Sequence, residues 1–127
     1  MATQSAVMTT QDIANRLYEL CKAGQYEQAQ EELYADDALS IEPVGAPGPQ
    51  SVKGLEEIVK KGEQFRDSIE AVHSASASEP IVAGNHFALT ITIDATFKGM
   101  GRNLMEEVAV YEVKDGKVIK EQFFYSM

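Results

Sequence analysis

Residues 87–94 read Phe-Ala-Leu-Thr-Ile-Thr-Ile-Asp, with an apolar side chain at each odd position and a small or polar one at each even position. This period of two is typical of a β-strand that buries one face. Turn signals lie at 84–85, at 98–101 and at Asp115-Gly116, and the last is the strongest hairpin signal in the chain. The sequence therefore predicts an antiparallel meander of long strands at about 69–78, 81–97, 103–113 and 117–125.

Ahead of this meander, apolar residues recur at helical spacing. Thr9 followed by Asp12 predicts an N-cap box, and Ala23-Gly24 predicts the end of the first helix. A second, shorter amphipathic stripe closes at the polar residues 35–37. The chain thus opens with a helical hairpin, whose stripes are Ile13, Leu17, Leu20 and Cys21, then Tyr26, Ala29, Leu33 and Tyr34.

Residues 39–43 predict a short strand, and the Gly- and Pro-rich residues 44–50 predict an irregular loop. A third helix is predicted from Gly54 onward, with one apolar face and one charged face. On the charged face, oppositely charged residues four apart predict surface ion pairs. The apolar residues are Leu55, Ile58, Val59 and Phe65, and the pairs are Glu56 with Lys60 and Glu57 with Lys61.

These elements predict an α+β domain in which N-terminal helices pack on a strongly curved antiparallel sheet and enclose a cavity. Pockets at the mouth of such a half-barrel are common ligand sites. A chain of 127 residues with 44% apolar residues has the size of one domain. We expect residues 9–127 to form this domain and residues 1–8 to be a disordered tail.

The chain carries 20 acidic and 11 basic residues, a formal net charge of -9. This charge repels a polyphosphate backbone, so nucleic acid is not an expected partner. The apolar runs are short, and residues 1–8 lack the basic start and apolar stretch of a secretory signal, so we expect no membrane association. The single cysteine, Cys21, has no partner for an internal disulfide, which favours a cytoplasmic location.

Residues 35–45 read Ala-Asp-Asp-Ala-Leu-Ser-Ile-Glu-Pro-Val-Gly, preceded by Ala23-Gly24 and followed by Asp-Gly-Lys-Val at 115–118. These motifs resemble the SnoaL-like branch of the nuclear transport factor 2-like superfamily, and the likeness runs from about residue 9 to residue 125. Similar bacterial proteins without an assigned function share the helix start at 52–56 and the ending at 121–125. The resemblance implies a cone-shaped half-barrel with a deep cavity, forming a homodimer through the outer face of the sheet. It implies no single chemistry, because polyketide cyclases, ketosteroid isomerases, dehydratases and non-catalytic binders share this fold.

The same resemblance makes Glu42 the most informative residue. Ketosteroid isomerases carry their acidic base in this place, just before Pro-Val-Gly. Their oxyanion-hole carboxylic acid falls on Ala109, and their helix-borne tyrosine falls on Leu17, with Tyr18 one position away. The resemblance therefore implies a base at Glu42 and leaves its two catalytic partners missing or displaced.

A carboxylate in a poorly hydrated cavity has its ionised form destabilised, which raises its pKa toward neutrality and makes it a usable proton acceptor. Glu42 is the candidate for this catalytic role, and the alternative is a solvated Glu42 that caps a turn at the cavity rim. Strand alternation also predicts a binding surface on one face of the last two strands. Its members are Glu107, Tyr111, Glu121, Phe123 and Tyr125. For its acidic members, the alternative is a solvent-facing position.

His73 shares a strand face with the small residues at 71, 75 and 77, which leave room for an imidazole that shuttles protons or anchors a ligand. The alternative is a hydrogen-bonded structural histidine, and His86 is expected at the surface. Two widely separated histidines give no metal-ligand spacing, so we expect no metal. No Gly-rich phosphate motif occurs, and we expect no cofactor. Cys21 lies on an apolar helix stripe and is expected in the core.

Three functions remain open from the sequence. The first is a binding module that encloses a small apolar or carbonyl-bearing ligand and does no chemistry. The second is a cofactor-free isomerase, cyclase or hydratase, in which Glu42 takes a proton next to a carbonyl. In that case the hydrogen bond to the developing oxyanion comes from His73, Tyr18 or Tyr125. The third is a dimerisation or protein-interaction domain, whose open sheet face is built from Val108, Val110 and Phe124.

Overall fold

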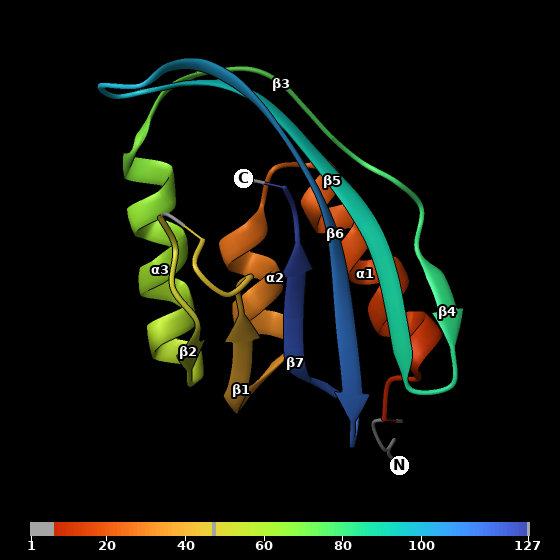
Figure 1. Cartoon of the computed structure of the whole chain (residues 1–127). Coiled ribbons are helices and arrows are strands. Elements are labelled where there is room, and N and C mark those ends of the chain that lie inside the picture. The colour runs from red at the N-terminus through yellow and green to blue at the C-terminus, as the bar shows by residue number, and fades with distance from the viewer. Residues whose placement is uncertain (1–6, 47, 127) are drawn as a thin grey trace.

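The computed structural model describes residues 7–46 and 48–126, which form a curved, unclosed sheet with helices on its concave side (Figure 1). The predicted α+β architecture is confirmed. Residues 1–6 of the predicted tail lie outside the described residues. The helices are α1 (Thr10–Lys22), α2 (Tyr26–Leu33) and α3 (Leu55–Asp67). The strands are β1 (Tyr34–Ile41), β2 (Val52–Lys53), β3 (Ile69–Ala77), β4 (Ile81–Ala83), β5 (His86–Phe97), β6 (Gly101–Lys114) and β7 (Lys117–Phe124).

The strand order is β2-β1-β7-β6-β5-β3, and β4 pairs with β5. The predicted antiparallel meander is confirmed from β3 to β7. The sheet as a whole is mixed rather than antiparallel, because β1 runs parallel to β7. A parallel pair needs a long crossover connection, and α3 together with the meander supplies it. This pairing brings Ser40 of β1 beside Glu121 of β7.

Two predicted strand boundaries are wrong. β1 begins at Tyr34 rather than at residue 39, so the polar residues 35–37 lie within a strand instead of at a corner. Tyr34 pairs with Val118, and the next pair joins Leu39 to Lys120. Between these pairs β1 advances by five residues and β7 by two. The extra residues form a bulge whose exposed side chains include both aspartates, which explains the polar pattern. The predicted strand at 81–97 is two strands, because the 84–85 turn folds β4 back onto β5.

Local signals at the N-terminus of α1 act as predicted. The Thr9 hydroxyl accepts a hydrogen bond from the backbone N–H of Asp12, and the Asp12 carboxylate accepts one from the backbone N–H of Thr9. This capping box satisfies two backbone donors that the first helical turn leaves free. The helix then buries its apolar stripe against the sheet, and the fully buried core side chains include Ile13, Leu17, Leu33, Ile58, Phe87 and Val118.

The Asp115-Gly116 turn joins β6 to β7 with φ angles of 53° and 75°. Two consecutive positive φ angles are what a two-residue hairpin turn requires, because its twist then matches that of the strands. The turn sets the first pairs, and a bulge between Val113 and Glu112 then shifts the register by one residue, which places Glu121 opposite Tyr111. Across the described residues, none of the helices has the length and apolar character needed to cross a membrane.

Candidate functional site

Hydrogen-bonded polar side chains from α3, from β1 and β7, and from the residue that follows each of these two strands meet on the concave side of the sheet. We call this group the Lys61 cluster. Polar side chains of this kind are costly to bury unless they satisfy one another. Its members are Tyr34, Ser40, Glu42, Lys61, Glu121 and Tyr125.

Strand alternation explains why β1 contributes to the cluster. Ala38 and Ser40 are both fully buried, whereas Leu39 between them is 38% exposed. Glu42 continues the inward-facing series just past the end of β1, and its side chain is only 8% exposed. Lys61 comes from α3, one turn after the fully buried Ile58, so it lies on the helix face that packs against the sheet.

The hydrogen bonds form a directional chain. Lys61 Nζ donates to Ser40 Oγ at 2.6 Å and to Glu42 Oε2 at 2.8 Å. The Ser40 hydroxyl donates in turn to Glu121 Oε2 at 2.6 Å, and the Tyr34 hydroxyl donates to Glu121 Oε1. The Tyr125 hydroxyl donates to the second oxygen of Glu42 at 2.8 Å. Both carboxylates therefore have both oxygens occupied by donors.

Lys61 and Glu42 make a largely buried ion pair, with side chains 11% and 8% exposed. Removing two charges from water costs several kcal/mol each, and only good geometry with additional hydrogen bonds offsets that cost. Ser40 and Tyr125 supply those additional bonds, one to each partner. The ion pair is thus stable only as part of the whole cluster.

Burial controls proton binding around the cluster. Glu121 is 2% exposed, and burial raises the pKa of its carboxyl even though Ser40 and Tyr34 donate to it. Glu107 faces the same side of β6 as the buried Ala109, and burial raises its pKa to about 7. The charges of Glu42 and Glu121 add to this rise, and Lys61 opposes it. A carboxyl that titrates near neutrality is suited to general acid or base work.

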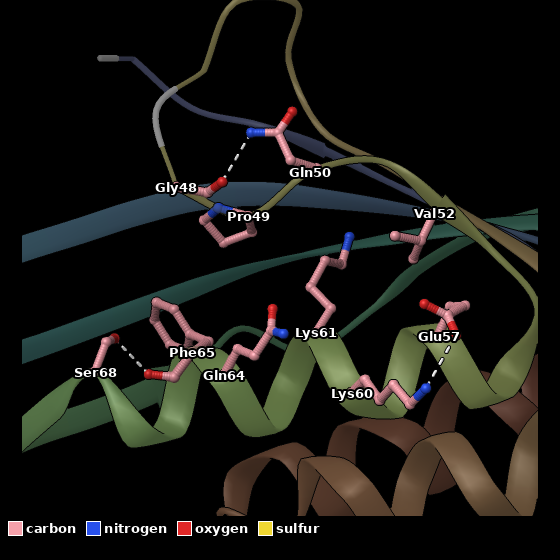
Figure 2. A pocket seen from close by; sticks show the side chains of 10 residues that line it. All are labelled: Gly48, Pro49, Gln50, Val52, Glu57, Lys60, Lys61, Gln64, Phe65 and Ser68. Carbon is pink, nitrogen blue, oxygen red and sulfur yellow. Dashed lines mark hydrogen bonds and ion pairs between the residues drawn. The ribbon is translucent and has the colours of Figure 1, made fainter.

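A pocket of about 320 Å³ lies between α3 and the loop around residues 48–50. Figure 2 shows the Lys61 side chain rising from α3 across this pocket, toward the loop and Val52. The wall also includes Pro49, Gln64 and Phe65. Glu42 is not among the residues that line the pocket, but its carboxylate contacts the Lys61 ammonium. A second hollow lies where α3 meets Glu31 of α2 and Asp36 of β1, and it contains no member of the Lys61 cluster.

The structure brings several of the sequence-predicted site residues together. Glu42, Glu121 and Tyr125 belong to the Lys61 cluster. Burial and the hydrogen bond to Glu42 raise the pKa of the Tyr125 hydroxyl, and the charge of Glu107 adds to this rise. The ring of Phe123 lies 5.8 Å from Lys61 Nζ. Tyr111 is buried behind the cluster, where its ring stacks on that of Phe87 at 4.7 Å between centroids.

Two predicted catalytic residues lie apart from the cluster. His73 is exposed on the edge strand β3, where its Nε2 lies 2.7 Å from Thr96 Oγ1. Tyr18 lies on α1, with Lys22 Nζ 5.0 Å from its ring centroid. Cys21 is in the core as predicted, and burial raises the pKa of its thiol to about 12, which makes it unreactive. His86 is at the surface, as predicted.

Sequence reasoning missed Lys61, Ser40 and Tyr34. The predicted surface pair of Glu57 with Lys61 is wrong, because Glu57 pairs with Lys60 at 3.4 Å and Lys61 turns toward the sheet. The spacing does contain a signal, since Lys61 follows Ile58 by three residues and therefore lies on the apolar stripe of α3. Within the described ranges, no group of three or more His, Cys, Asp or Glu side chains is placed to hold a metal ion.

Comparison with known proteins gives a family and a fold. The sequence pattern of the family described as SnoaL-like domain matches residues 8–125. A Mesorhizobium loti structure is 38% identical, with a TM-score of 0.86 over 93% of this chain and 100% of that chain. It is described as a candidate SnoaL-like polyketide cyclase and, in brackets, as a carbohydrate phosphatase. That description gives two different activities and so assigns neither one here.

More distant structures share the fold alone. A Xanthomonas campestris protein of unknown function with a cystatin-like fold is 16% identical, with a TM-score of 0.77 over 94% of this chain and 92% of that chain. A Catenulispora acidiphila protein with a ketosteroid isomerase-like fold, in complex with trimethylamine, is 19% identical. Its TM-score is 0.70 over 94% of this chain and 88% of that chain. The comparison with curated proteins gives no match.

Proposed function

The chain belongs to the SnoaL-like domain family, and from that premise we propose that it binds a small apolar or carbonyl-bearing molecule in the pocket beside Lys61. One observation carries the proposal: the nearly buried ammonium group of Lys61 lies in the wall of a pocket. The apolar side chains of this wall are Val52, Pro49 and Phe65. Small-molecule sites usually combine apolar surface with polar groups in fixed positions, and the rest of this wall is polar, with Gln50, Gln64 and Ser68.

Filling the pocket is expected to abolish binding. Gln64 lines the pocket and is exposed, so Gln64→Trp places an indole in the cavity with little effect on the core. We expect isothermal titration with tetralin and with its ketone, tetralone, to show saturable binding to the wild type. The affinity should fall by at least about tenfold in Gln64→Trp, since the ligand and the indole compete for one space.

The matched control is Gln28→Trp, which makes the same change at an exposed position of α2 outside the pocket. It should bind both compounds as the wild type does. Equal binding by all three proteins, or no binding of either compound to the wild type, would contradict the proposed function.

A second candidate is a cofactor-free isomerase, cyclase or hydratase that acts on a carbonyl compound, and the pKa of Glu107 near 7 favours it. The sequence-based candidate for the base is Glu42, although its carboxylate oxygens already accept hydrogen bonds from Lys61 and Tyr125. We expect the wild type to accelerate exchange of the protons beside the tetralone carbonyl into heavy water, followed by NMR. The exchange should slow about a hundredfold in the variant that lacks the base.

Glu42→Gln and Glu107→Gln decide which carboxyl is the base. Slowing in Glu107→Gln alone would assign the role to Glu107, and slowing in Glu42→Gln alone would assign it to Glu42. Unaccelerated exchange in the wild type would remove the catalytic candidate and leave the binding proposal standing.

Homodimer formation through the outer face of the sheet is also part of the proposal. Val108 and Phe124 are opposite each other on neighbouring strands and are 42% and 49% exposed, and Leu104 on the same strand as Val108 is 56% exposed. Exposed apolar side chains in one area favour an interface. We also propose a cytoplasmic location, which the single cysteine without an internal disulfide partner favours.

A further inference from the structure

We propose that Lys61 Nζ is the hydrogen-bond donor that the pocket offers to the carbonyl oxygen of a neutral ligand, and that Ser40 and Glu121 position this ammonium. The inference rests on the proposed binding function and adds the group that selects the ligand. It gives the pocket a donor on α3, where sequence reasoning looked for one on His73, Tyr18 or Tyr125.

The Lys61 ammonium has more N–H donors than it has hydrogen-bond acceptors among the described residues around it. A lysine side chain carries three N–H donors and no acceptor. In Lys61, one N–H points to Ser40 Oγ and one to Glu42 Oε2. No hydrogen-bond acceptor for the third lies among the residues that the structure describes, although the Phe123 ring centroid is 5.8 Å from Nζ, and the side chain lines the pocket (Figure 2). The remaining donor is therefore available to an acceptor atom inside the pocket.

The Lys61 ammonium cannot rotate freely, because its two acceptors are themselves held in place. Ser40 uses its own hydrogen to donate to Glu121 Oε2, so toward Lys61 it acts as an acceptor. Glu121 is itself held on its other oxygen by the Tyr34 hydroxyl. Two fixed acceptors set the directions of two N–H bonds and hence the direction of the third. A donor that is oriented before the ligand arrives pays no reorganisation cost on binding.

Charge decides which acceptor suits this donor. Glu42 already neutralises Lys61, and the carboxyl groups of Glu107 and Glu121 lie on the same side of the sheet. The other charged residues of the wall, Lys60 and Glu57, pair with each other, so an anionic head group would add a further negative charge beside one ammonium and three carboxyls. A cationic head group would face the ammonium and cannot accept its hydrogen. A neutral carbonyl oxygen accepts the bond and adds no charge.

Matched ligands isolate this hydrogen bond from the rest of the pocket. Tetralone and tetralin share a hydrocarbon skeleton and differ in the carbonyl oxygen, and tetralin carboxylate and aminotetralin supply the charged versions. With the wild type we expect tetralone to bind about tenfold more tightly than tetralin, as one charge-assisted hydrogen bond provides. The carboxylate and the amine should both bind more weakly than the ketone.

The test variant is the double substitution Lys61→Met with Glu42→Gln. Removing both charges together avoids an unpaired buried carboxylate, so this variant keeps more stability than Lys61→Met alone. The ketone should lose its advantage and bind within about twofold of tetralin, while the affinity for tetralin stays unchanged. The matched control is Lys22→Met with Glu19→Gln, which removes an exposed ion pair of α1 outside the pocket. It should keep the tenfold ratio.

The possible results distinguish the role of Lys61, the choice of a neutral ligand and the binding function itself. A ketone advantage that survives in the Lys61→Met, Glu42→Gln variant overturns the assignment of Lys61. Equal binding of tetralone and tetralin to the wild type also overturns it but leaves the binding function intact. Tighter binding of the carboxylate overturns the choice of a neutral ligand. If the wild type binds neither tetralin nor tetralone, the proposed function fails, and this inference fails with it.

The positioning role of Ser40 has its own readout. Ser40→Ala removes one acceptor from Lys61 and one donor from Glu121 while leaving the pocket wall in place. We expect the ratio of tetralone affinity to tetralin affinity to fall several-fold, with the tetralin affinity unchanged. A purely structural role would weaken both ligands together, and that outcome would overturn the positioning claim.

Discussion

Lys61→Met is expected to lower the free energy of unfolding by about 3 kcal/mol, at the lower end of what breaking a buried ion pair costs. The substitution keeps a long apolar side chain in place, so little packing volume is lost. It leaves the Glu42 carboxylate largely buried with Tyr125 as its remaining donor, and it takes a donor from Ser40. Urea denaturation followed by circular dichroism gives the free energy directly.

Lys60→Met is the control, because it makes the same change one position away on α3. Lys60 is 58% exposed and pairs with the exposed Glu57, so its loss should cost less than about 0.5 kcal/mol. The double variant Lys61→Met with Glu42→Gln should recover a large part of the stability lost in Lys61→Met. A Lys61→Met protein as stable as Lys60→Met would show that the buried ion pair is not formed.

Glu107→Gln is expected to stabilise the protein above neutral pH and to leave its stability unchanged in mild acid. The folded-state pKa of Glu107 is raised from 4.5 to about 7, so its contribution to stability is fully present below pH 4.5 and is lost as the pH rises through 7. Glutamine mimics the protonated carboxyl at every pH. The difference between variant and wild type should therefore grow to as much as about 3 kcal/mol by about pH 8.

The measurement is a set of urea denaturation curves between about pH 4.5 and pH 8. Glu42 and Glu121, which raise this pKa, and Lys61, which opposes the rise, are present in both proteins, so the difference isolates Glu107. Glu106→Gln, at the exposed neighbouring position of β6, should follow the wild type throughout. Parallel curves for wild type and Glu107→Gln would contradict a buried position for this carboxyl.

The parts of the fold that the sequence predicted correctly depend on neighbouring residues. The alternation at 87–94, the Asp115-Gly116 turn and the Thr9–Asp12 capping box each act within a few residues, and each is present as predicted. The parallel pairing of β1 with β7 was missed because the two strands are about 80 residues apart and no local pattern selects the partner. The bulge in β1 was missed because its exposed aspartates resemble a turn.

In the candidate site, too, local patterns predicted some residue positions correctly and missed others. Alternation along β6 and β7 predicted a common face for Glu107 and Glu121, and the structure places both near Glu42. Lys61 was assigned to the surface because its spacing from Glu57 suits a helical ion pair. Only the packing of α3 on the sheet decides which way Lys61 points, and tertiary packing of this kind is not encoded in a four-residue spacing.

The side-by-side arrangement of β1 and β7 also governs the timing of assembly. Ser40 and Glu42 emerge early during synthesis on the ribosome, whereas Glu121 and Tyr125 emerge about 80 residues later. A nascent chain without β7 has Lys61 and Glu42 but neither the carboxylate that holds Ser40 nor the phenol that holds Glu42. Contacts of such high sequence separation slow folding, because the chain must close a long loop before they form. The Lys61 cluster is therefore complete only after β7 has paired with β1.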